Sequence, residues 1–189
     1  GKRGRGATGK GAEQGVGGIE ELFDDAKGDR EARCGDPSLP TDLRFEAMLP
    51  VLQPTSGQNA DAQKPVFVLA NDYDQIQAAV SFIDRHHLKG VIVGGMDAPL
   101  AAGSLKRHGI PVLISNMFRF PKRADGDFDE PFSLPAKLKA AGVRFCLTSG
   151  EEAANERNLP FAAGLAVAHG LDREEAVRSI TLSAAEILG

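Results

Sequence analysis

From residue 64 onward, apolar and polar positions follow one another in blocks whose lengths suit short strands and amphipathic helices. Four blocks are of strand length and apolar, apart from Arg144 in the last: 65–70, 90–94, 111–114 and 143–147. Strands that lack an apolar/polar alternation are typical of a parallel sheet with helices covering both faces. The blocks therefore predict four buried parallel strands.

Segments with helical periodicity separate these strands. Apolar residues recur at spacings of three and four, which places them on one helical face, in segments 74–87, 99–108 and 134–141. Two more helices are predicted after the last strand, over 159–169 and 173–188. Strand and helix in regular succession predict an α/β fold. Periodicity alone does not decide whether the sheet closes into a barrel or stays open.

The first 63 residues follow a different pattern. Residues 1–18 are rich in glycine and basic residues, a composition that predicts a flexible tail. The next segment has Ile19, Leu22, Phe23 and Ala26 at helical spacing, and Thr41 or Asp42 is suited to cap a short second helix. We therefore divide the chain into a tail (1–18), a helical lead-in (19–63) and a β/α region (64–189).

Composition excludes several classes of protein. The net charge of −4 and the sequence pI near 5.6 provide no basic field for nucleic acid. No apolar run reaches the length of about 18 residues needed to span a bilayer. The two cysteines, Cys34 and Cys146, cannot form a disulfide framework. No signal peptide is visible, but the chain starts at Gly1, so we expect the natural N-terminus to lie upstream and assign no compartment.

Small polar residues follow each predicted strand. They are Asn71 after the first, Asp97 after the second, Asn116 after the third and Ser149 after the fourth. Barrels and open parallel sheets both bind ligands at the carboxyl ends of their strands. We expect these four residues to line a pocket for a small polar ligand. The alternative is that such residues cap the helices that follow, which is the simpler explanation for Asp72 and Asp97.

The remaining motifs give little evidence for a metal, phosphate or catalytic site. The four histidines (His86, His87, His108 and His169) follow no predicted strand, and most lie at predicted helix ends, where a cation complements the helix dipole. We therefore assign none of them as a metal ligand. The run from Gly4 to Gly11 nearly matches a phosphate-binding loop, but Gly11 stands where Ser or Thr is needed, and no strand precedes it. Ser149 does not lie in a Gly-x-Ser-x-Gly elbow.

The closing region gives the most specific signal. Residues 158–171 continue into a segment that ends Thr181-Leu182-Ser183-Ala184-Ala185-Glu186-Ile187-Leu188-Gly189, a T-x-x-x-A-x-x-L-G pattern. This region resembles the end of the barrel in the amidohydrolase superfamily, particularly its imidazolonepropionase-like and dihydroorotase-like members. Residues 43–52 and 65–68 resemble the approach to barrel strand 5 in the same group. The resemblance covers about residues 40–189 and implies strands 5–8 of a TIM-like (β/α)8 barrel.

The resemblance also implies where metal ligands belong. The family hydrolyses carbon–nitrogen bonds other than peptide bonds with zinc or another divalent metal, using histidines on strands 1, 5 and 6, a Lys or Glu on strand 4 and an Asp after strand 8. In this chain the strand-5 position falls at 69–71, the strand-6 position at 94–97 and the strand-8 position at Ser149 or Gly150. None of these positions carries the family's ligand, so we predict a degenerate metal centre, with no metal held by this part of the barrel.

Two hypotheses follow. The first is an amidohydrolase-like protein, descended from hydrolases of non-peptide carbon–nitrogen bonds, that keeps a pocket for a small polar or cyclic amide-like ligand. The second is a noncatalytic scaffold or subunit that associates with another chain or with the missing half of the barrel. A half-barrel exposes sheet edges and apolar faces, and such surfaces usually acquire a partner.

Overall fold

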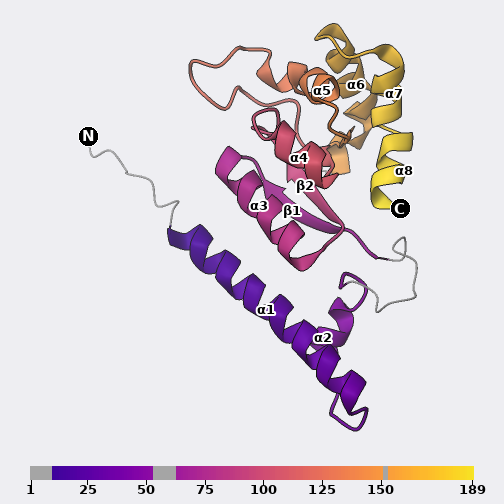
Figure 1. The fold of residues 1–189 in the computed structure, drawn as a ribbon. Helices are drawn as coiled ribbons and strands as arrows, with labels where there is room; N and C mark the ends of the chain where they lie inside the picture. Colours follow the sequence, from indigo (N-terminus) through magenta and orange to yellow (C-terminus); the bar gives the residue numbers. More distant parts are fainter. Residues whose placement is uncertain (1–9, 53–62, 151–152) are drawn as a thin grey trace. The chain divides into compact units, whose positions relative to one another are not determined.

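The computed structural model describes residues 10–52, 63–150 and 153–189, and the chain divides into two units, Gly1–Ala62 and Gln63–Gly189 (Figure 1). The first unit contains two helices, α1 (Lys10–Gly35) and α2 (Leu43–Met48). Helix α1 takes in residues 10–18, which the composition assigns to a tail, because an established helix gains one hydrogen bond for each residue added. Residues 1–9, which hold the rest of that tail and most of the phosphate-loop match, lie outside the described residues.

Helix α2 begins where the sequence predicts. Asp42 is its N-cap, and the Asp42 carboxylate accepts a hydrogen bond from the backbone N–H of Arg44 at 2.9 Å. This contact satisfies one of the N–H groups that a helix leaves unpaired in its first turn. Of the two candidate caps, Thr41 and Asp42, the structure selects the aspartate.

The second unit is built on one parallel sheet. Its strands are β1 (Val66–Ala70), β2 (Gly90–Gly94), β3 (Val112–Ile114) and β4 (Phe145–Leu147), and they are hydrogen-bonded in chain order. All three neighbouring pairs are parallel, which confirms the predicted α/β class. A doubly wound sheet reverses its strand order at a switch point, whereas a barrel keeps it sequential. The four strands are consistent with half of a TIM-like barrel.

Three helices make the connections between strands: α3 (Tyr73–His86), α4 (Ala102–His108) and α5 (Glu130–Ala141). Helix α3 packs on β1 and β2 (Figure 1). Helix α5 starts four residues earlier than its periodicity predicts, because Pro131 fits the first turn, where the missing N–H has no helical partner. None of the helices in the described part of the chain is both long enough and apolar enough to cross a membrane.

The closing helices differ from the prediction. After a 3-10 turn (Ala153–Asn158) come α6 (Leu159–Ala168), α7 (Arg173–Ser179) and α8 (Leu182–Leu188), so the single helix expected over 173–188 is two helices. The break falls at Thr181, whose φ of −133° and ψ of −92° are not helical. The Thr181 hydroxyl donates to the carbonyl of Val177 at 2.8 Å, a side-chain bond that offers the backbone an alternative to a continuous helix.

The two faces of the sheet are covered unequally. The strand register puts Phe67, Leu69, Val91, Val93, Leu113 and Cys146 on one face. Helix α8 covers part of this face, since its Ile187 joins Val91 and Cys146 in a buried cluster. Toward β1 the cover ends, and the side chains of Phe67 and Leu69 are 43% and 72% exposed. The prediction of fully buried strands is therefore wrong for β1.

Candidate functional site

The four polar residues predicted to form a site all follow the carboxyl ends of strands, and these ends share one edge of the parallel sheet. The structure brings Asn71 and Asp97 together through the backbone. The N–H of Asp97 donates to the carbonyl of Asn71 at 2.9 Å, and the N–H of Gly95 donates to the carbonyl of Ala70 at 2.9 Å. The ends of β1 and β2 therefore form one continuous rim.

The Asn71 side chain depends on a glycine in the neighbouring strand. Gly94 has a φ of +101°, and a Cβ placed on it would lie 2.2 Å from the Asn71 Oδ1. Only glycine gives both this backbone conformation and this space. Among the described residues, Oδ1 of Asn71 is buried without a hydrogen-bond partner. A buried acceptor left in that state costs about 1–3 kcal/mol, so Asn71 is held there at a cost in stability.

Asp97, the carboxylate of the rim, has both a backbone and a side-chain partner. Its Oδ2 accepts a hydrogen bond at 3.1 Å from the N–H of Tyr73, the first residue of α3. Asp97 therefore satisfies the N-terminus of the helix after β1, whereas the capping hypothesis assigned it to the helix after β2. The same oxygen contacts the ammonium of Lys122. Burial acts to raise the pKa of Asp97, but the hydrogen bonds from Lys122 and Tyr73 outweigh it and hold the pKa below its usual value.

Lys122 is a site residue that the sequence analysis missed. It lies in the long loop between β3 and α5, and its Nζ contacts both Asp97 and Asp72. Burial acts to lower the pKa of Lys122, but the two carboxylates raise it further, so the side chain stays an ammonium. Two acidic residues after adjacent strands, followed by a lysine in the next loop, are the sequence signal that could have predicted this contact.

Asn116 and Ser149 form a second part of the rim. Asn116 follows β3 and has a left-handed backbone, with a φ of +56°. A Cβ placed on Gly150 would lie 3.9 Å from the Cβ of Asn116, so the ends of β3 and β4 are adjacent here. Ser149 is half-buried between Thr148 and Gly150. No hydrogen bond of the described residues joins this pair to Asn71 and Asp97, so the rim consists of two polar groups.

The metal centre implied by the resemblance was tested against the donors of the described residues. No group of three or more His, Cys, Asp or Glu side chains in those parts of the chain is arranged to hold a metal ion. Asp72 and Asp97 already contact an ammonium. The histidines lie at helix ends, with His86 and His108 closing α3 and α4, and His87 and His169 as C-caps. These residues do not fit the family's metal site.

A hollow also exists at the opposite end of the sheet. It has a volume of about 190 Å³ and lies where the strands begin; its lining includes Lys89, Gly90, His108, Pro111, Arg144 and Glu186. Parallel β/α folds bind ligands at the carboxyl ends of strands, and this hollow is at the amino ends. We therefore place the candidate site at the rim of Asn71, Asp97, Asn116 and Ser149.

No family model matches this chain, and no curated protein sequence does. Among solved structures it is similar to the crystal structure of an amidohydrolase from Thermotoga maritima, with a TM-score of 0.75 and 23% identity over 92% of this chain. The fold is amidohydrolase-like. The match spans 44% of the Thermotoga chain, so this chain corresponds to less than half the length of that protein.

Proposed function

We propose that this chain belongs to an amidohydrolase-like protein with a degenerate metal centre, whose rim binds a small polar, amide-like ligand. The ancestral reaction of such a protein is hydrolysis of a carbon–nitrogen bond other than a peptide bond. The observation that carries the proposal is the state of Asp97. Its Oδ2 already accepts from Tyr73 and contacts the ammonium of Lys122, so a metal ion at this oxygen would have to displace a cation that the chain itself supplies.

The chemistry of the rim suits an amide. An amide presents an N–H donor beside a carbonyl acceptor, so its binding site must supply both a hydrogen-bond acceptor and a donor. Asn116 and Ser149 can each donate and accept, and Asp97 accepts through a carboxylate whose lowered pKa keeps it ionised. A cyclic amide or ureide carries donors and acceptors on one ring, and it has no charge for which the rim would need a new counter-ion.

Ligand binding can be tested with hydantoin, a cyclic ureide, as the probe. We expect saturable shifts of the backbone amide signals of Asn116 and Ser149 in NMR titrations of the full chain. Asn116→Ala and Ser149→Ala should weaken the binding. The matched control is Ser81→Ala, because Ser81 is an exposed residue of α3 whose hydroxyl donates to the carbonyl of Gln77 in its own helix. Shifts that do not saturate, or that survive both rim substitutions, would contradict a site at this rim.

The metal part of the proposal has its own measurement. We expect the purified chain to retain less than stoichiometric zinc after dialysis, by elemental analysis, and hydantoin binding to be unchanged by a chelator. Stoichiometric zinc, together with hydrolysis of hydantoin that stops on chelation, would overturn the degenerate centre and favour a working hydrolase.

A noncatalytic subunit is the second candidate, and the exposed side of β1 favours it. Phe67 and Leu69 present apolar side chains there, and in the described part of the chain no strand pairs with the outer edge of β1. The partner we propose is a further β/α unit whose strand runs parallel to β1. The length of the Thermotoga protein supports this choice, because 56% of that chain (100 minus the 44% covered) has no counterpart here.

Association through β1 is testable by sedimentation. We expect Leu69→Ser to reduce self-association and binding of a hydrophobic dye, because it removes the most exposed apolar side chain of the sheet. Leu182→Ser, at a half-exposed leucine of α8, is the matched control. Identical sedimentation of the unmodified chain and both variants, with identical dye binding, would argue against a docking face on β1.

A further inference from the structure

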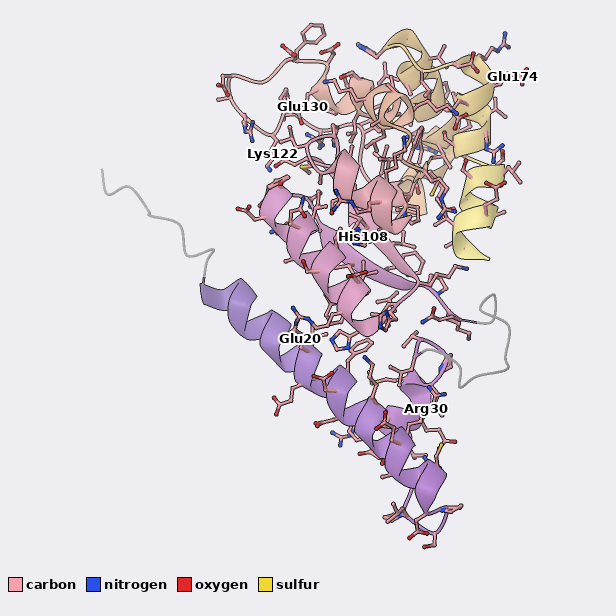
Figure 2. All side chains as sticks on the ribbon, viewed as in Figure 1. Glu20, Arg30, His108, Lys122, Glu130 and Glu174 are labelled. Carbon is pink, nitrogen blue, oxygen red and sulfur yellow. The ribbon has the colours of Figure 1, made fainter. Side chains whose placement is uncertain are left out.

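Lys122 links three parts of the second unit. Its ammonium reaches Asp72, the second residue after β1, and Asp97, in the loop after β2. Its backbone N–H donates at 3.1 Å to a carboxylate oxygen of Glu130, the first residue of α5. Figure 2 shows Lys122 and Glu130 on the long segment that leaves β3 and enters α5. The lysine therefore attaches this loop to the ends of two strands that lie earlier in the chain.

The same glutamate, Glu130, also fixes a second residue of this loop. The other oxygen of Glu130 accepts at 3.2 Å from the guanidinium of Arg119, whose side chain is 9% exposed. Arg119 also donates to the carbonyl of Phe120 at 3.1 Å. Because Glu130 fixes the backbone at Lys122 and the side chain at Arg119, the ammonium of Lys122 has a defined position over the strand ends.

Two carboxylates converge on the ammonium of Lys122. Oxygens of Asp72 and Asp97 contact the same Nζ; the Asp97 side chain is 12% exposed, whereas that of Asp72 is 52% exposed. Like charges brought this close repel each other unless a counter-ion lies between them, and the repulsion is least screened at the partly buried Asp97. An ammonium has three donors and no acceptor, so it can satisfy several carboxylate oxygens at once, as a divalent metal does.

We propose that Lys122 is an internal cation that takes the place of a divalent metal between Asp72 and Asp97, and that it thereby holds the 115–129 loop over the candidate ligand site. The inference relies on the proposed function only for the location of that site. Lys122 is thus a positioning residue: it keeps the carboxylates paired and the loop in place without contacting a reacting atom.

The experiment removes the charge and asks whether a metal replaces it. The variants are Lys122→Met, which keeps the length of the side chain, Lys122→Arg, which keeps the cation, and the matched control Lys137→Met, at an exposed lysine of α5. Mn²⁺ is the probe, because it broadens the NMR signals of nearby amides. In Lys122→Met we expect Mn²⁺ to broaden the amide signals of Tyr73 and Asp97, and adding Asp97→Asn should abolish the effect. In the unmodified chain, Lys122→Arg and Lys137→Met, these signals should stay sharp.

Hydrogen exchange provides an independent measurement of the loop. Without Mn²⁺, Lys122→Met should exchange amide hydrogens in 115–129 about tenfold faster than the unmodified chain, the effect of losing roughly 1.4 kcal/mol of local stability. Lys122→Arg should restore slow exchange. If Lys122→Met does not fold by circular dichroism, Asp97→Asn serves instead, since it removes one of the two charges and is expected to speed exchange in the same loop.

Two results would overturn the inference. One is broadening of Tyr73 and Asp97 by Mn²⁺ in the unmodified chain, which would show that Lys122 leaves the carboxylates open to metal. The other is a Lys122→Met variant in which Mn²⁺ leaves the signals of Tyr73 and Asp97 sharp, or in which the 115–129 amides exchange no faster than in the unmodified chain. Hydantoin binding is measured in a separate titration. If hydantoin does not bind, the Mn²⁺ and exchange measurements still test the role of Lys122.

Discussion

Replacing Gly94 by alanine is the sharpest test of how the rim is built. The new Cβ would lie 2.2 Å from the Asn71 Oδ1, closer than side-chain atoms pack, and alanine would have to adopt a φ of +101°. The backbone part costs roughly 1–2 kcal/mol, because a Cβ crowds the carbonyl in left-handed conformations. The steric part costs typically about 1–3 kcal/mol. We therefore expect Gly94→Ala to lower the free energy of unfolding by roughly 2–5 kcal/mol.

Urea denaturation followed by circular dichroism measures this change, and two further variants separate its causes. Gly103→Ala is the matched control, since Gly103 lies in α4 with nothing within 4 Å of a new Cβ. It should stabilise the chain by up to about 1 kcal/mol through helix propensity. Asn71→Ala should restore part of the loss in the Gly94→Ala background, roughly 1–3 kcal/mol, because it relieves the steric clash but not the backbone strain. A Gly94→Ala variant within about 0.5 kcal/mol of the unmodified chain would refute this account of the rim.

Three further predictions concern charge, reactivity and packing. The pKa of Asp97 is lower in the folded than in the unfolded chain. Ionised Asp97 therefore stabilises the fold above the usual aspartate pKa near 4, and this contribution is lost as pH falls through the folded pKa. Asp97→Asn should cost more stability at pH 7 than at pH 3 in urea titrations. Burial raises the pKa of Cys146 to about 11, so a thiol reagent at neutral pH should label the exposed Cys34 and leave Cys146 unreacted until the chain unfolds; fast labelling of both would contradict this. Leu138 on α5 is fully buried, so Leu138→Ala should cost about 2–5 kcal/mol in the same denaturation assay, whereas Leu182→Ala, at a half-exposed leucine, should cost well under half as much.

Much of the fold was predictable because the sheet is local. The β2 strand is continuous and apolar from Gly90 to Gly94, and the structure has it with these bounds. Every neighbouring pair in the sheet is joined by one connection of the chain, so periodicity within each segment carries most of the information. The break at Thr181 was missed because it depends on a side-chain bond to Val177 that leaves no trace in the apolar pattern.

The candidate site was less predictable than the strands that carry it. The rule that parallel strands end at one edge places Asn71 and Asp97 near each other, and their backbone contact follows from it. The role of Lys122 depends on how a long loop folds back across 25 positions of sequence, and residues in irregular loops show no periodicity to analyse. The half-barrel hypothesis led us to expect an exposed apolar face, but the apolar pattern did not assign that exposure to Leu69, because an apolar strand looks the same whether its neighbour is present or absent.

The packing of α8 on the sheet has a consequence for how the protein is made. Ile187 completes a buried cluster with Val91 and Cys146, so the sheet face between β2 and β4 stays open until position 187 has left the ribosome. The strands can pair earlier during synthesis, but this part of their core closes only when α8 has been made. A nascent chain stalled before Leu182 would therefore present Val91 and the thiol of Cys146 to chaperones and oxidants that the folded β/α unit excludes.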